Sequence, residues 1–282
     1  DILRVDASQI GARVIGEGGN LGLTQKGRIE FASRGGRLYT DAIDNSAGVD
    51  CSDHEVNIKI LLGGLLSRGD MTLKQRDALL ASMTDDVGRL VLADNYQQTQ
   101  AISLEVAAGG ELLDAHGRLL RQLETRAGLH RDIEALPDDQ ALAERAQQKR
   151  ALTAPEIAVL LAYVKISLKQ TILASTLPDA ADLHELLVDY FPAALREPCG
   201  ELLAAHPLKR EIITNQLVNR LVNRLGTTFV MRLEEETGAE PTEIAAACHA
   251  ASAALDAEAL WQSLEALDLQ LPASRQQALM NG

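Results

Sequence analysis

The hydrophobic pattern changes character early in the chain, at Ser52. Before it, residues 12–20 ("ARVIGEGGN") form a short β-branched run that ends in glycines, and residues 37–42 ("RLYTDA") form a second brief run. Between them, residues 24–36 ("TQKGRIEFASRGG") predict a short helix with a glycine stop. A strand, a helix and a strand over about 30 residues predict a βαβ unit with parallel strands and a right-handed crossover.

After Ser52 the pattern predicts helix after helix. Residues 52–69 place their apolar side chains on roughly one helical face, and Gly69 ends that segment. The face consists of Val56, Ile58, Ile60, Leu61, Leu62 and Leu65. Thr72 opens the next predicted helix, residues 72–95. The polar residues 136–150 are predicted to be either a solvated connection or a charged helix.

Clear start and stop signals mark the later helices. Thr153 and Glu156 form a capping box with Pro155 in the first turn, and Pro178 closes the helix that follows. Residues 208–226 carry one broad apolar face and end at Gly226, where a C-cap glycine belongs. That face consists of Leu208, Ile212, Ile213, Leu217, Leu221, Val222 and Leu225.

These patterns predict a mainly α protein with two parts. Residues 1–66 are predicted to be a short α/β (βαβ) remnant of a Rossmann-like dinucleotide-binding domain, and residues 67–282 a C-terminal helical domain. Only 3% of the residues are aromatic, so the core is built from Leu, Ala, Ile and Val, which suits packed helices.

Charge and cysteine content narrow the class of protein. A formal net charge of −13 argues against a nucleic-acid surface, which needs clustered Lys and Arg. The cysteines, Cys51, Cys199 and Cys248, lie far apart and form no CxxC pair, which predicts a reducing, cytoplasmic compartment. The longest apolar run stops at Lys165, well short of the ~20 residues that span a bilayer, so we expect no membrane insertion. Because the chain does not begin with Met, we also expect it to be part of a longer polypeptide.

Residues 16–20 ("GEGGN") are the first candidate site, since they end a predicted strand. Glycines there let a ligand approach the backbone, and open α/β sheets bind ligands at the carboxyl ends of parallel strands. A tight turn with positive φ explains the glycines equally well. Asn20 adds an amide that can hold a ribose hydroxyl or a carboxamide.

Residues 44–55 ("DNSAGVDCSDHE") are the second candidate. Asp50 with His54, or Cys51 with His54 or Glu55, has helical metal-ligand spacing. A capping box of Ser52 and Glu55 explains the same crowding as a helix start, so we assign no metal ligand.

Two further interpretations of this stretch differ in strength. A nucleophilic Cys51 is disfavoured, because the stretch lacks a Lys or Arg and its carboxylates raise a thiol pKa. The favoured interpretation is the lip of a pocket, in which residues 45–48 ("NSAG") lead into a helix N-terminus that can receive an anionic substrate group.

The two candidate stretches together carry a family resemblance. Residues 16–62 resemble the closing part of the dinucleotide-binding domain of glutamate dehydrogenases, specifically the large bacterial NAD-specific class. Residues 155–169 and 208–239 resemble the helical C-terminal region of that class. The resemblance implies the C-terminal part of an enzyme that uses NAD to deaminate L-glutamate oxidatively to 2-oxoglutarate and ammonium, acting as a homo-oligomer in the cytoplasm.

The resemblance also implies residue roles. Smaller enzymes of the superfamily carry an E-G-A-N motif that "EGGN" matches, so Gly18, Gly19 and Asn20 would bind the cofactor. Their N-A-G-G-V-T-V-S segment corresponds to "NSAGVDCS", so Asn45 would face the nicotinamide and Ser52 would bind the side-chain carboxylate of glutamate. In this segment Ser, Asp and Cys replace the family's Ala, Thr and Val. We assign no catalytic residue and expect the proton-transfer groups upstream and the isolated fragment to be inactive.

The alternative hypothesis is a helical interaction or regulatory module with no catalytic role. Asn215, Asn219 and Asn223 recur every four residues beside Arg220 and Arg224. This polar stripe either faces a partner subunit or lies on an ordinary solvated face. Glutamate-dependent NADH formation by the full-length protein separates the two hypotheses.

Overall fold

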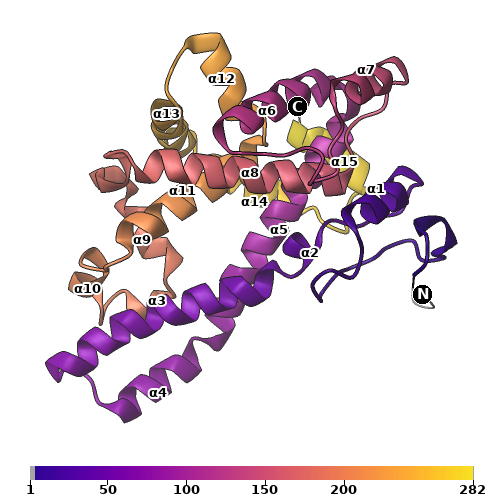
Figure 1. Cartoon of the computed structure of the whole chain (residues 1–282). Coiled ribbons are helices and arrows are strands. Elements are labelled where there is room, and N and C mark those ends of the chain that lie inside the picture. The colour runs from indigo at the N-terminus through magenta and orange to yellow at the C-terminus, as the bar shows by residue number, and fades with distance from the viewer. Residues whose placement is uncertain (1–3, 282) are drawn as a thin grey trace.

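The computed structural model describes residues 4–281, so the first three residues of the predicted 1–66 unit lie outside it. The chain folds into α-helices joined by short 3-10 turns (Figure 1). In chain order they are α1 (Gln25–Ser33), α2 (Asp41–Asp44), α3 (Ser46–Arg68), α4 (Leu73–Ser82), α5 (Thr84–Ala108), α6 (Leu113–Arg126), α7 (Asp139–Gln147), α8 (Ala154–Leu173), α9 (His184–Tyr190), α10 (Gly200–Ala204), α11 (Lys209–Leu225), α12 (Phe229–Thr237), α13 (Pro241–Ala254), α14 (Ala257–Glu265) and α15 (Ala273–Asn281).

The prediction of a mainly α protein is confirmed, but the two predicted strands do not form within residues 4–281. What remains is one isolated parallel bridge between Val14 and Arg37, on either side of α1. The Ile15 amide donates to the Arg37 carbonyl at 3.0 Å, and the Arg37 amide donates to the Arg13 carbonyl at 3.0 Å. Val14 is 67% exposed, so one face of this pair is open to solvent, and two short segments alone do not extend into a stable ladder.

A small separate core holds this N-terminal part together. Ala7, Phe31 and Leu38 are buried in one cluster, apart from the large core of the helices. Gly36 allows this packing, because a Cβ at its position would overlap the Phe31 ring.

We expect Gly36→Ala to destabilise the N-terminal part by about 1–3 kcal/mol, because the added methyl must displace a buried ring. Hydrogen exchange of the α1 amides measures this local opening. Gly11→Ala is the matched control, since a Cβ there meets nothing within 4 Å. Equal protection in the two variants would contradict the close-packing argument.

Several predicted helix ends are confirmed. Thr72 and Gln75 form a capping box at the start of α4, and Thr153 does the same for α8. Gly69 ends α3 in the left-handed conformation, with φ +80°. The prediction of one helix over residues 72–95 is wrong, since the chain breaks at Met83 between α4 and α5. Met83 is 1% exposed, and the break lets this side chain enter the core.

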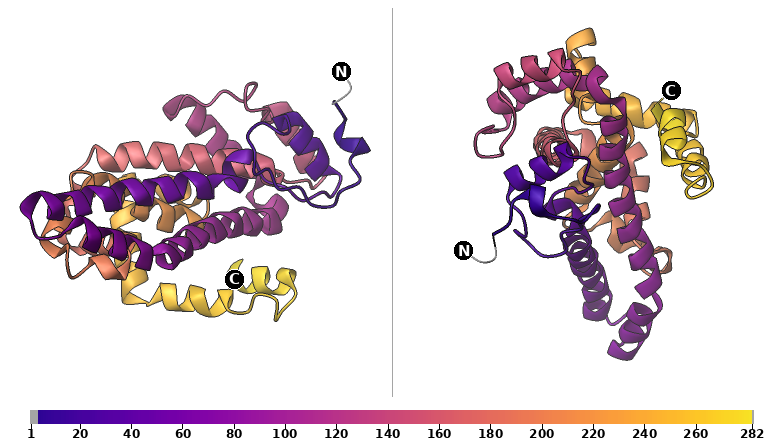
Figure 2. Two further views of the ribbon diagram at one scale, coloured as in Figure 1. Left: turned by 90° about the horizontal axis from the view of Figure 1, so that it is seen from below. Right: turned by 90° about the vertical axis from the view of Figure 1, so that its right-hand side faces the viewer.

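The centre of the molecule is the packing of α8 and α5 against α11, with α3 lying along α5 (Figure 1). The predicted apolar face of α11 is largely buried, although Leu208 and Leu225 remain 39% and 40% exposed. The last two helices, α14 and α15, lie along one side of the molecule (Figure 2), where α15 contacts α5. No helix among the described residues is both long and apolar enough to cross a membrane.

The asparagine stripe does not lie on a solvated face. Asn223 is 2% exposed, and Asn215 and Asn219 are half-buried on α11. The stripe therefore does not form one exposed polar surface, although the Arg220 side chain beside it is 40% exposed. Most of the polar segment 136–150 forms α7, which settles the choice between a connection and a charged helix.

Candidate functional site

The helix that carries the candidate pocket lip begins earlier than the sequence predicts. α3 starts at Ser46, so Ser52 lies inside it rather than at its N-cap. The Ser52 hydroxyl donates to the Gly48 carbonyl at 3.1 Å, and Glu55 pairs with Lys59. The predicted capping box is therefore wrong. α2 runs almost directly into α3 through Asn45, and the helical conformation propagates from upstream through the polar stretch.

The polar residues of this stretch separate onto two faces of α3. Asn45 and Ser52 are seven residues apart, nearly two helical turns, so they share one face with Gly48 between them. Gly48 and Ser52 are exposed and Asn45 is half-buried. Asp50 and His54 lie on another side, which faces α5. The candidate lip and the candidate metal ligands are thus distinct surfaces of one helix.

The structure brings together the two asparagines assigned to the cofactor. The Asn45 side-chain amide donates to the Asn20 Oδ1 at 2.9 Å, across 25 positions of sequence. This bond leaves the Asn20 amide nitrogen and the Asn45 Oδ1 directed at no hydrogen-bond partner among residues 4–281. A Cβ at Gly18 or Gly19 would meet no atom within 4 Å, so both glycines border open space. Ser52 shares the helix face but has no direct hydrogen bond to either asparagine within the described chain.

A buried ion pair holds the glycine-containing turn of residues 16–23 in place. Arg28 on α1 donates to both carboxylate oxygens of Glu17, at 2.6 and 2.8 Å, and the two residues are 6% and 5% exposed. The hydrogen bonds that Arg28 donates to Glu17 raise the pKa of Arg28 despite burial, so the guanidinium stays charged. Glu17 also accepts the Leu23 amide at 3.2 Å. The pair therefore anchors the turn from both of its ends.

Two aspartates of α2 fix the same turn from the other side. The Glu17 amide donates to Asp44 at 2.9 Å, and the Leu21 amide donates to Asp41 at 2.9 Å. The Leu21 amide and, to a smaller degree, the Arg28 charge hold the pKa of Asp41 below its ordinary value. No sequence pattern predicts these contacts, since Glu17, Arg28, Asp41 and Asp44 resemble ordinary surface charges.

Ser46, at the start of α3, connects the site to α5. Its hydroxyl donates to Asn95 Oδ1 at 2.6 Å and accepts from the Gln98 amide at 2.5 Å. Where the smaller enzymes carry Ala, this chain therefore has a hydroxyl that bonds two side chains of the neighbouring helix.

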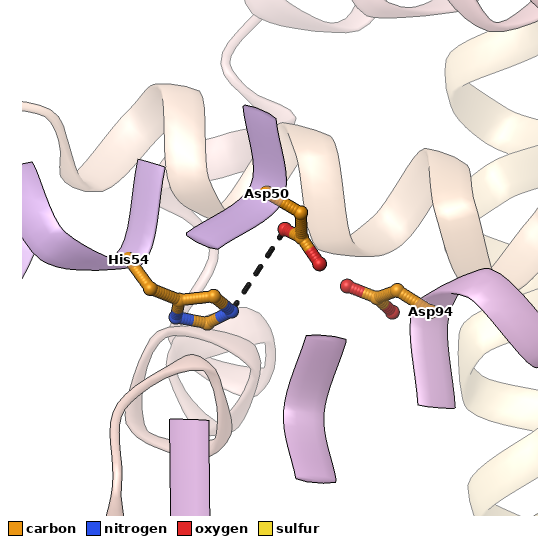
Figure 3. Close-up of side chains that lie close together, drawn as sticks. All are labelled: Asp50, His54 and Asp94. Carbon is orange, nitrogen blue, oxygen red and sulfur yellow. Dashed lines mark ion pairs between the residues drawn. The ribbon is translucent and has the colours of Figure 1, made fainter. Parts of the chain in front are cut away.

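A second group of polar side chains lies on the α5 side of α3. The ligand-type atoms of Asp50, His54 and Asp94 all lie within 4.8 Å of one another (Figure 3). Their spacing along the sequence pairs Asp50 with His54, whereas no sequence signal indicates Asp94, which only the packing of α5 on α3 brings close.

Two family models match different parts of the chain. Residues 1–105 match the model described as "Bacterial NAD-glutamate dehydrogenase, catalytic domain", and residues 149–282 match "Glutamate dehydrogenase, C-terminal". The chain thus combines a catalytic-domain segment with a C-terminal helical segment of the glutamate dehydrogenase class.

Relatives with the same name cover nearly the whole chain. The NAD-specific glutamate dehydrogenases of Pseudomonas aeruginosa, Halomonas elongata and Mycobacterium tuberculosis are 48%, 45% and 44% identical to it over 100%, 99% and 97% of its length. The chain spans 17% of the length of each of these proteins. The chain belongs to the family of bacterial NAD-specific glutamate dehydrogenases.

Proposed function

We propose that this chain supplies one wall of the active site of an NAD-dependent glutamate dehydrogenase, which deaminates L-glutamate oxidatively to 2-oxoglutarate and ammonium. The observation that carries the proposal is the Asn20–Asn45 hydrogen bond, because it joins the two residues to which the family resemblance gives the cofactor. The curated relatives are named as NAD-specific enzymes, which supports the choice of cofactor.

The residues present fit the edge of a nicotinamide nucleotide. The open space at Gly18 and Gly19 admits a ligand against the backbone, and the Asn20–Asn45 bond fixes the orientation of both amides. Asn20 then offers an N–H donor and Asn45 a carbonyl acceptor, the complement of a ribose hydroxyl or a carboxamide. NAD, when bound, accepts the hydride from the substrate Cα. The residues of this chain bind the cofactor and orient it for this transfer.

Ser52 has a different task in this proposal. Its hydroxyl proton is engaged with the Gly48 carbonyl, so binding the side-chain carboxylate of glutamate requires the hydroxyl to rotate away. The exchange replaces a neutral hydrogen bond by a charge-assisted one, which is roughly twice as strong. Its exposure on α3 leaves the hydroxyl free to make this exchange.

We expect Asn45→Ala and Ser52→Ala to separate the two ligands in the full-length protein. Loss of one hydrogen bond, about 0.5–1.5 kcal/mol, raises the KM for NAD in the first variant and for glutamate in the second by about 2- to 10-fold. Steady-state NADH formation measures both. Cys51→Ser, exposed on the same helix, is the matched control. Unchanged KM values in both variants would mean that the active site lies elsewhere.

The remaining features of the proposal are broader. We place a domain division near residue 66, close to the end of α3 at Arg68. A cytoplasmic location is supported by the free state of Cys51, Cys199 and Cys248. We expect the enzyme to act as a homo-oligomer and the isolated chain to form no NADH from glutamate.

A further inference from the structure

The group formed by Asp50, His54 and Asp94 has the composition of a metal site and lies away from the lip face of α3. Asp50 and His54 are one turn apart on α3, and Asp94 approaches from α5 (Figure 3). His54 Nε2 lies 3.9 Å from Asp50 Oδ1, which is beyond hydrogen-bond distance. The three side chains therefore face one another without bonding directly.

His54 is a buried side chain without a partner. It is 1% exposed, and neither ring nitrogen has a hydrogen-bond partner within residues 4–281. The imidazole is stacked on the Tyr190 ring, with centroids 4.4 Å apart and an angle of 16° between the planes. Asn57 donates to the Tyr190 hydroxyl at 2.9 Å and so restrains that ring. The stack holds Nε2 toward the two carboxylates, where a buried polar atom requires a partner.

The charge of the group is not balanced by direct ion pairs. Burial raises the pKa of Asp50 to about 6, and the nearby Asp94 and Asp53 carboxylates add to the shift. Burial also raises the pKa of Asp94, although Lys165 opposes it. No Lys or Arg of the described residues forms an ion pair with Asp50 or Asp94.

We propose that Asp50, His54 and Asp94 bind a divalent transition-metal cation, for which Zn²⁺ is the test ion. One imidazole with two carboxylates suits such a cation, whereas Mg²⁺ and Ca²⁺ prefer oxygen ligands alone. Metal bonds of about 2.0–2.2 Å place ligand atoms roughly 3–3.5 Å apart, so the side chains need to close by about 1 Å. The Asp50 side chain is 23% exposed, which provides an entry path and room for water as a further ligand.

The ammonium of Lys165 is the competing occupant, because among the cations that act on Asp94, which include Arg220 and Lys169, it lowers the Asp94 pKa most. Burial and the neighbouring Lys169 lower the pKa of Lys165 to about 7. If the cation is a metal ion, Lys165→Met tightens metal binding by removing a repulsive charge.

The experiment uses the full-length protein, freed of metal with a chelator and titrated with Zn²⁺. We expect Asp94→Asn to weaken Zn²⁺ binding at this site at least tenfold. The rise in Tm that Zn²⁺ produces when it fills this site in the wild type should then be lost, because ligand binding stabilises the folded state by mass action. The near-isosteric Asn keeps the packing, and the Tm without metal reports folding. Glu55→Gln, exposed on the same helix and paired with Lys59, is the matched control and should bind within about twofold of wild type.

Two further measurements complete the test. The absorption spectrum of bound Co²⁺ reports its ligands, and we expect His54→Gln to change that spectrum while Glu55→Gln leaves it unchanged. Equal Zn²⁺ affinity of wild type and Asp94→Asn, or loss of binding in Lys165→Met, would overturn the proposal and leave a lysine-neutralised carboxylate cluster.

Discussion

Replacing Glu105 with leucine is expected to lower the free energy of unfolding by about 3–5 kcal/mol. Glu105 on α5 is 5% exposed, and its carboxylate accepts the Thr227 amide at 2.5 Å and the Thr227 hydroxyl at 2.9 Å. His116 Nε2 of α6 lies 2.9 Å from the same carboxylate. Leucine would leave these groups buried without an acceptor, next to the turn at Gly226, where φ is +87°.

Urea unfolding followed by circular dichroism measures this loss. Glu105→Gln retains an acceptor oxygen and should lose less stability than Glu105→Leu. The control is Glu236→Leu, at an exposed position of α12, which should stay within about 0.5 kcal/mol of wild type. If Glu105→Leu matched this control, the carboxylate would not be the junction of α5, α6 and the turn before α12.

Arg28→Met is the second substitution with a large expected effect, because it leaves Glu17 buried without its cation. Breaking a buried ion pair by removing one partner destabilises by about 3–5 kcal/mol. The loss should appear as local opening of residues 16–23, whose turn Glu17 anchors, and as a raised KM for NAD in the full-length protein. Hydrogen exchange and steady-state kinetics measure the two effects.

The double variant Glu17→Gln with Arg28→Met tests the cause. Removing both charges eliminates the uncompensated carboxylate, so the double variant should recover part of the protection lost in Arg28→Met. Arg34→Met removes the same charge from an exposed position next to α1 and should leave protection and KM unchanged. No recovery in the double variant would mean that Arg28 acts by packing rather than by charge.

Local signals predicted the helices well where one residue type decides the geometry. Capping boxes at Thr72 and Thr153 and the C-cap glycines at Gly69 and Gly226 work through the nearest turns of backbone, and the structure confirms them. The break at Met83 escaped prediction, because it depends on a buried position that only the packing of other helices provides.

For the candidate site, too, some features were predicted correctly from the sequence and others were not. Asn20 and Asn45 were predicted from motifs, and the structure places them within hydrogen-bond distance, although their roles stay predictions. The capping box at Ser52 failed because its spacing is also compatible with a helix interior, and α2 extends the helix upstream. The prediction of two strands was wrong because a strand needs neighbouring strands to form a sheet. A local alternation of residues does not specify those neighbours.

The sequence by itself determined the mainly α class, several helix ends and the family resemblance, since these depend on side-chain periodicity, on caps and on motifs. Only the tertiary structure decided that Glu17 and Arg28 are a buried pair and that Asp94 meets Asp50 and His54. Such groups join residues that are distant in the chain. Their proximity depends on how whole helices pack, and no local spacing encodes that distance.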